Sequence, residues 1–282
     1  MSKSTTPPAG LKAIIPLIFA LLGGCLSLAW STTAKAQASP WVQGDKSQAR
    51  LLAAGGMAAG RYLAGVEIRL APKNLTYWKL PGDAGVPPVF SFEGSKNLKS
   101  AHPLYPAPRR FPEAGGEAFG YMDEVLFPLL VTPTDPTKPV SLDLKLDYAT
   151  CEKICIPARA ELHLDLAPGA RESAEVGLLN AWLDRTPRPA GDPAAPRPIL
   201  TRAGKPNAWH VRFDGTAPAD LFAEGPDDWF FDTRRSADGF DLILAQKPAD
   251  APTGPVELIL TMVVGDRAFE ARTPLDVERS KP

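Results

Sequence analysis

The chain has 282 residues, 44% of them hydrophobic and 22% charged, which is enough for one large domain or two ordinary ones. Its 31 basic and 32 acidic residues give a formal net charge of −1, so there is no electrostatic basis for binding nucleic acid or an anionic membrane surface. The 31 prolines and 23 glycines, with few helical stretches between them, favour an all-β protein.

Residues 1–38 have the features of a cleaved secretory signal peptide. Two lysines precede an uncharged apolar run at 13–30, and "AKA" and "AQA" within 34–38 place small residues at the cleavage spacing. We therefore expect export to the periplasm and a mature N-terminus near Gln37 or Ser39.

Two alternatives to cleavage stay open at this N-terminus. The apolar run is nearly long enough to be retained as a membrane anchor. The tetrapeptide "LGGC" would instead place a lipidated Cys25 at the start of a mature lipoprotein.

Alternation of apolar and polar residues predicts a first β-domain at 40–170. Apolar side chains at every second position are typical of half-buried antiparallel strands in a sandwich. Three segments show this pattern, with Tyr62, Ala64, Val66, Ile68 and Leu70 in the first, Val140, Leu142, Leu144, Leu146 and Tyr148 in the second, and Ala160, Leu162, Leu164 and Leu166 in the third.

A short helix and a proline-rich linker are predicted at 171–198. Apolar residues at helical spacing predict a helix over 172–185, with Ser173 as its N-cap. The following segment, 186–198, holds five prolines and reads as an extended linker. Strand patterns then return at 209–213, 240–246 and 256–273, which predicts a second, smaller β-domain at 199–282.

The segment "TCEKICIP" places two of the chain's three cysteines in a turn between two predicted strands. Counting the alternation forward from the first strand puts Cys151 on the outer face. In the second strand Ile154 and Ile156 would face the core, so Cys155 would also point outward. Pro157 suits a sheet edge, because it lacks a ladder donor.

Three interpretations of the cysteine pair compete on the residues alone. A structural disulfide is common in exported proteins, although so short a ring contributes only about 2 kcal/mol. A metal site lacks ligands for structural zinc, since His163 faces solvent on its strand, but Cu(I) could bind two thiolates. A redox dithiol is favoured by tight spacing and exposure.

Four blocks in order resemble the N-terminal periplasmic domain of the DsbD family of thiol:disulfide interchange proteins, and its ScsB-like branch in particular. They are "NLTYWKLPGDAGVPP" at 74–88, "YPAPRRF" at 105–111, "GYMDEVLFPLLV" at 120–131 and "DYATCEKICIPARAEL" at 147–162. The resemblance implies an immunoglobulin-like β-sandwich followed by the second smaller β-domain.

The resemblance also implies a function for the cysteine pair. The family domain takes electrons from a thioredoxin-like domain fed by a membrane-embedded reductase, and passes them to thioredoxin-like periplasmic proteins. This chain shows neither a transmembrane bundle nor a C-x-x-C domain, so a separate membrane-embedded reductase is the expected donor. We expect no cofactor and no resident metal.

Carried over residue by residue, the resemblance assigns Cys151 and Cys155 as the catalytic redox pair. Our hypothesis is that Cys155 attacks or is attacked first, although the spacing does not decide between the two. The family's aromatic cap corresponds to 109–120, with Phe111 as the first candidate and Phe119 as the second, and Gly115 and Gly116 as the hinge. Tyr77 and Trp78 match the aromatic block that lines the site, although ordinary core packing is an alternative for each ring.

Two departures from the family pattern bear on the function. DsbD spaces its cysteines farther apart, and acidic residues there moderate the thiols, whereas Glu113 is the only acid in the expected cap. The alternative function is therefore a non-catalytic module that binds a thioredoxin-like partner or copper and keeps a structural disulfide.

Overall fold

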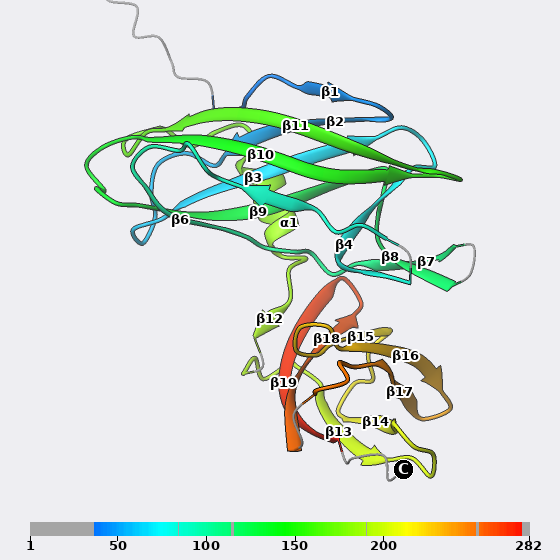
Figure 1. Cartoon of the computed structure of the whole chain (residues 1–282). Coiled ribbons are helices and arrows are strands. Elements are labelled where there is room, and N and C mark those ends of the chain that lie inside the picture. Colours follow the sequence, from blue (N-terminus) through cyan, green and yellow to red (C-terminus); the bar gives the residue numbers. More distant parts are fainter. Residues whose placement is uncertain (1–36, 84, 114–115, 190, 252–253, 278–282) are drawn as a thin grey trace, which may run out of the picture. The chain divides into compact units, whose positions relative to one another are not determined.

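Two sheets built from the alternating segments enclose the first core. The computed structural model describes residues 37–83, 85–113, 116–189, 191–251 and 254–277, all within one compact unit. One sheet has the order β1-β2-β3-β9-β6, formed by Val42–Gly44, Ser47–Ala53, Tyr62–Leu70, Glu124–Pro133 and Leu98–Pro103 (Figure 1). The expected signal peptide and Cys25 lie outside the described residues, except for 37 and 38.

The second sheet carries the cysteine hairpin at one edge. Its order is β11-β10-β4-β8-β7, formed by Cys155–Leu166, Val140–Cys151, Leu75–Gly82, Gly116–Met122 and Arg109–Glu113, and the short β5 (Val89–Ser91) also pairs with β10. Because β11 is the edge strand, Pro157 breaks no ladder bond on the outer side, as the sequence predicts.

The predicted alternation places one side of each strand in a shared core. Buried side chains from both sheets meet in it, including Leu51, Val66, Phe127, Leu142 and Leu162. The two sheets therefore form a sandwich, which we call the first sandwich, and the all-β immunoglobulin-like expectation is confirmed.

The helix is shorter than predicted and packs on the first sandwich. Helix α1 covers Val176–Leu183, and its N-cap is Glu175 rather than Ser173. The Ser173 hydroxyl accepts from the Glu175 backbone nitrogen at 3.1 Å, so it bonds the turn that precedes the helix. Leu179 is buried above Gly65 of β3, where an added Cβ would lie 2.6 Å from the Leu179 methyl group.

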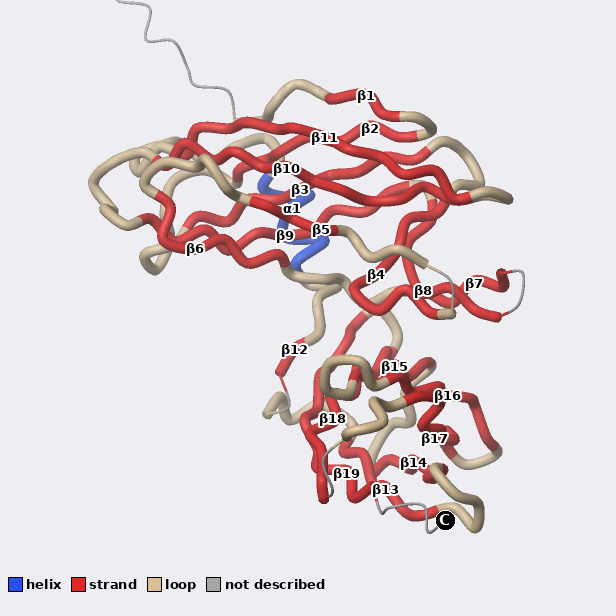
Figure 2. The backbone as a smooth tube through the Cα atoms, viewed as in Figure 1, coloured by secondary structure: helices blue, strands red, loops and turns tan. Residues whose placement is uncertain are grey.

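A second pair of sheets follows, which we call the second sandwich (Figure 2). One sheet has the order β12-β19-β18-β15, formed by Arg188–Pro189, Arg267–Val277, Gly254–Val264 and Asp220–Glu224. The other has the order β13-β14-β17-β16, formed by Arg197–Arg202, Ala208–Asp214, Gly239–Gln246 and Phe230–Ser236.

The second sandwich has its own core, with buried side chains from both of its sheets, including Trp209, Leu242, Leu260 and Phe269. Two short pieces of strand fall inside the segment predicted as an extended linker. β12 pairs in parallel with β19, and β13 begins at Arg197. The proposed domain boundaries at 170 and 199 stay a prediction.

Candidate redox site

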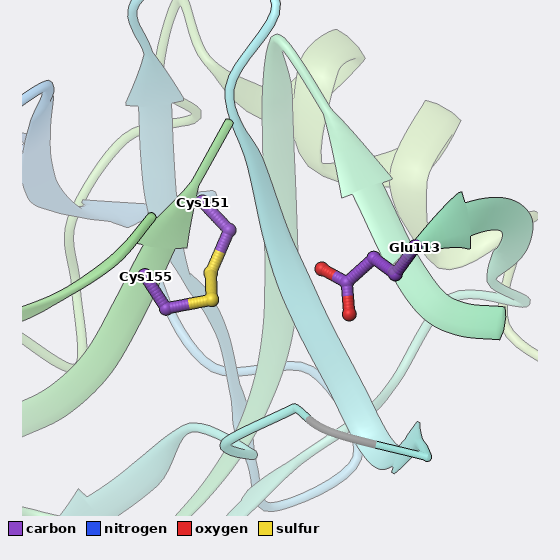
Figure 3. A group of neighbouring side chains, drawn as sticks. All are labelled: Glu113, Cys151 and Cys155. Carbon is purple, nitrogen blue, oxygen red and sulfur yellow. A yellow bond between two sulfur atoms is a disulfide. The ribbon is translucent and has the colours of Figure 1, made fainter. Parts of the chain in front are cut away.

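A long hairpin positions the cysteine pair. β10 and β11 pair without a break from Val140 opposite Leu166 to Cys151 opposite Cys155. The register therefore brings the two cysteines together at the last rung, just before the turn. They form a disulfide with an S–S distance of 2.07 Å and Cα atoms 4.2 Å apart (Figure 3).

The two cysteine residues differ in their exposure to solvent. Cys151 is 2% exposed, whereas Cys155 is exposed. Cys151 does point away from the main core, as the alternation predicts, but other side chains cover that face. A thiolate arriving from solvent therefore meets the Cys155 side of the bond first.

The prediction for Ile154 was wrong. It is 77% exposed, because residues 152–154 form the turn and do not belong to the pleated ladder. The alternation that holds along β10 and β11 does not continue through such a turn. An apolar side chain consequently projects into solvent between the two cysteines in the sequence.

A small apolar cluster covers Cys151 on the outer face of the sheet. Its members come from β4, β7, β8 and β10 and are Leu75, Tyr77, Phe111, Ala118, Ala149 and Cys151. These residues alternate with neighbours that face the main core, so the cluster is separate from it. Phe111 is 8% exposed at the margin of this cover.

The Tyr77 hydroxyl connects the disulfide with an acidic side chain. It donates to Cys151 Sγ at 2.9 Å and lies 3.0 Å from Cys155 Sγ. It also donates to Glu113 Oε1 at 3.0 Å. Burial, and then the neighbouring Glu113 carboxylate, raise the pKa of Tyr77 well above its ordinary value, so the hydroxyl stays protonated and available as a donor.

Glu113 completes a set of three potential metal ligands. Its carboxylate and the two sulfurs lie within 4.8 Å of one another, and Figure 3 shows the carboxylate directed toward the disulfide from β7. No other group of three or more potential ligands occurs in the described parts of the chain. The sulfurs can act as ligands only after the disulfide is reduced, because the thiolate is the metal-binding form.

The structure separates the four aromatic rings expected at the site into two pairs. Tyr77 and Phe111 belong to the cluster with Cys151. Trp78 and Phe119 face the opposite side of the sheet, where both pack on Phe222. The expected hinge is described only at Gly116, since residue 115 lies outside the described residues.

Two features of the site were missed by the sequence interpretation. Leu75, Ala118 and Ala149 complete the cover, and Arg110, next to Phe111, faces the second sandwich. Adjacent residues on a strand point to opposite faces, so the position of Arg110 could have been inferred once Phe111 was placed.

A half-covered cysteine pair thus lies at the end of an edge hairpin of the first sandwich, where it can exchange with other thiols. Residues 47–167 match the family described as "Thiol:disulfide interchange protein DsbD, N-terminal". The match covers less than half of the chain and includes the sequence blocks that predict this family. No curated protein matches the chain.

A solved structure has a similar fold. The crystal structure of the N-terminal periplasmic domain of ScsB from Proteus mirabilis matches with a TM-score of 0.63 at 19% identity. The match covers 86% of this chain and 99% of that chain, so the likeness of fold extends beyond the first sandwich. Within the described residues, no helix has both the length and the apolar character needed to cross a membrane.

Proposed function

We propose that the chain is a periplasmic thiol:disulfide exchange protein that uses Cys151 and Cys155 as its redox pair. The observation that carries the proposal is the asymmetric disulfide, in which Cys155 is exposed and Cys151 is buried beside the Tyr77 hydroxyl. A bond that only stapled the hairpin would need neither an exposed cysteine nor a hydroxyl shared by both sulfurs. The match of residues 47–167 to the DsbD N-terminal family supports the same chemistry.

The exchange step follows from this geometry. A thiolate of a reduced partner attacks Cys155 Sγ, a mixed disulfide forms, and the bond to Cys151 breaks. Cys151 leaves as a thiolate that receives a hydrogen bond from Tyr77. The partner's second thiolate then attacks the mixed disulfide and releases Cys155, so the partner becomes a disulfide and this chain a dithiol. Protons taken up from water restore the two thiols.

Glu113 acts on this step through Tyr77. The carboxylate and the leaving thiolate are both acceptors for the one Tyr77 proton. A negative carboxylate close to the sulfurs also disfavours the thiolate form. Glu113 therefore moderates the reactivity of the pair, which is the part that acidic residues play in the family.

The partners we propose are those of the family. A separate membrane-embedded reductase with a thioredoxin-like domain supplies electrons, and thioredoxin-like periplasmic proteins receive them. The signal peptide is cleaved in this proposal, with a mature N-terminus near Gln37 or Ser39, as the small residues within 34–38 predict. Intact-mass measurement of the exported protein checks this site, and a mass that includes a diacylglyceryl Cys25 would show a lipoprotein instead.

The redox potential of the pair tests the proposal. Equilibration with glutathione should give a potential between about −120 and −270 mV, the range of exchange proteins. A potential below about −300 mV would mark an inert structural bond and refute the redox function.

Trapping tests which sulfur is attacked. Cys151→Ser leaves the exposed Cys155 and should accumulate a mixed disulfide with a thioredoxin-like protein. Cys155→Ser leaves only the buried Cys151 and should accumulate much less. Equal trapping by both variants would contradict the assigned order of attack.

A second candidate function is soft-metal binding by the reduced pair. The observation that favours it is the approach of Glu113 to both sulfurs, which offers two thiolates and one carboxylate. Titration of the reduced protein with Cu(I) against a chromogenic chelator tests this candidate. Binding that Glu113→Gln weakens would support it, and failure to compete with the chelator would exclude it.

A further inference from the structure

The hairpin of β7 and β8 has two faces, and the disulfide uses only one of them. Phe111 lies opposite Ala118 in the register, and both belong to the cluster with Cys151. Arg110 lies opposite Phe119, one position along each strand, so these two side chains project from the other face. Neither of these two side chains takes part in the exchange step described above.

The second sandwich binds the guanidinium of Arg110 through three residues. Nε donates to the Asp220 carboxylate at 2.8 and 3.0 Å. One terminal nitrogen donates to the Leu221 carbonyl oxygen and to Thr233 Oγ1, each at 2.6 Å. The other terminal nitrogen donates to Glu117 of its own hairpin at 2.8 Å. Such charge-assisted contacts are among the stronger hydrogen bonds in proteins.

Aromatic rings enclose the same guanidinium. Its central carbon lies 4.8 Å from the ring centre of Phe119 and 4.8 Å from that of Phe222. The two rings also contact each other edge to face, with centres 5.0 Å apart. Phe119 belongs to the hairpin and Phe222 to the second sandwich. The Arg110 guanidinium, partly shielded from water by the two rings, therefore connects the hairpin with the second sandwich.

Strand β4 repeats this arrangement. Tyr77 faces the sulfurs, while the adjacent Trp78 packs on Phe222 with ring centres 5.5 Å apart. Lys79 then pairs with Glu224 at 2.7 Å. Both strands that bring Tyr77 and Phe111 to the disulfide are thus bound by the second sandwich through neighbouring positions.

We propose that the second sandwich positions the hairpin β7–β8 over the disulfide, and that Arg110 is the positioning residue. This inference rests on the proposed exchange function, because it gives the second sandwich a part in that reaction. Arg110 and Phe111 are consecutive on one strand, so loss of the contacts at Asp220 displaces the ring that covers Cys151. Attack on a disulfide needs an open line to a sulfur, and the displaced ring opens a second line, to Cys151, in addition to the one at the exposed Cys155.

Reduction of the full-length oxidised protein by dithiothreitol tests the inference. Arg110→Ala should be reduced about tenfold faster than the parent, which corresponds to about 1.4 kcal/mol in the uncovering equilibrium. The redox potential should stay at the parent's value, because Arg110 contacts neither sulfur and acts on access to the bond rather than on its stability. Arg212→Ala is the matched control. It removes an exposed ion pair with Asp238 (2.7 Å) within the second sandwich, away from the disulfide, and it should be reduced at the parent's rate.

A double-mutant cycle distinguishes positioning from a merely structural role. If Arg110 acts through the ring of Phe111, then Arg110→Ala should add nothing to the rate of Phe111→Ala. Additive effects would overturn the proposal.

A second variant guards against misfolding of the first. Near-ultraviolet circular dichroism shows whether Arg110→Ala has kept its fold. If it has not, Asp220→Asn takes its place in the test. This substitution keeps the shape of the side chain and removes its charge, so it should accelerate reduction by a smaller factor than tenfold. Parent-like rates in every folded variant would refute the inference. Dithiothreitol needs no protein partner, so this outcome is independent of whether exchange with thioredoxin-like proteins is found.

Discussion

The Tyr77 hydroxyl serves three acceptors with one proton. In the oxidised protein it contacts both sulfurs and the Glu113 carboxylate at 2.9 to 3.0 Å. When the disulfide opens, the Cys151 sulfur becomes charged in a site where it is 2% exposed to solvent. The hydroxyl is then the donor nearest to a charge that water reaches poorly, so its contribution is larger in the transition state than in the resting bond.

Tyr77→Phe should therefore slow reduction of the disulfide by dithiothreitol about tenfold. The substitution keeps the buried ring and removes a hydrogen bond to a developing charge, which contributes about 1.5 kcal/mol. Stopped-flow measurement of the rate checks this, with Tyr105→Phe as a control whose ring packs elsewhere in the first sandwich. A rate equal to the parent's would mean that the hydroxyl has no part in the step.

At the scale of single residues, the sequence predicted which residues lie at the site better than it predicted their burial and orientation. The resemblance placed Cys151, Cys155 and Tyr77 at the site, and the structure brings all three together. The burial of Cys151 could not be read from alternation, because the cover comes from three other strands. Phe119 and Trp78 were expected on the wrong face, since an aromatic pattern does not say which side of a strand faces the disulfide.

The hairpin β7–β8 is the element on which the cover depends. Its strands are short, and β7 contains Pro112, which pairs with Glu117 at a sheet edge. Such a segment shows no sustained alternation, which is why the residue pattern predicted no strands there and only the resemblance identified it, as the aromatic cap. The long strands β10 and β11 were predictable because every second side chain is buried along all of β10 and along β11 from Ala158 onward.

Phe111→Ala should accelerate reduction of the disulfide about tenfold, if uncovering corresponds to about 1.4 kcal/mol. It should lower the free energy of unfolding by only about 2 kcal/mol, less than the roughly 3–5 kcal/mol of a phenylalanine in a main core. The ring belongs to a small cluster and is 8% exposed, so its removal leaves a site that solvent can enter. Rates from stopped flow and stabilities from urea titration check both parts.

The control for this variant is Phe213→Ala. Phe213 packs on Phe240 in the second sandwich, so its removal should cost stability and leave the rate unchanged. Acceleration by Phe213→Ala as well would show that general destabilisation, rather than the lost cover, controls access to the sulfurs.

At the scale of the whole molecule, contacts between the two sandwiches lay beyond sequence interpretation. Arg110 and Asp220 are 110 residues apart, and nothing in either segment marks them as partners. The pair Lys79–Glu224 is similar, with side chains 31% and 13% exposed and a distance of 2.7 Å between the charged atoms. Burial raises the pKa of Glu224, and the Lys79 ammonium opposes that shift without cancelling it.

The raised pKa of Glu224 predicts how stability changes with pH. The ordinary pKa of a glutamate is 4.5, so above this pH Glu224 is ionised in the unfolded chain but still protonated in the folded protein. Between pH 4.5 and the raised pKa, the free energy of unfolding therefore falls as the pH rises. Glu224→Gln removes that fall, so it should gain stability relative to the parent across this window. Lys79→Met should extend the fall to higher pH, because the opposing charge is lost. Urea titrations at a series of pH values check both, and three parallel curves would show that Glu224 ionises alike in the folded and unfolded chains.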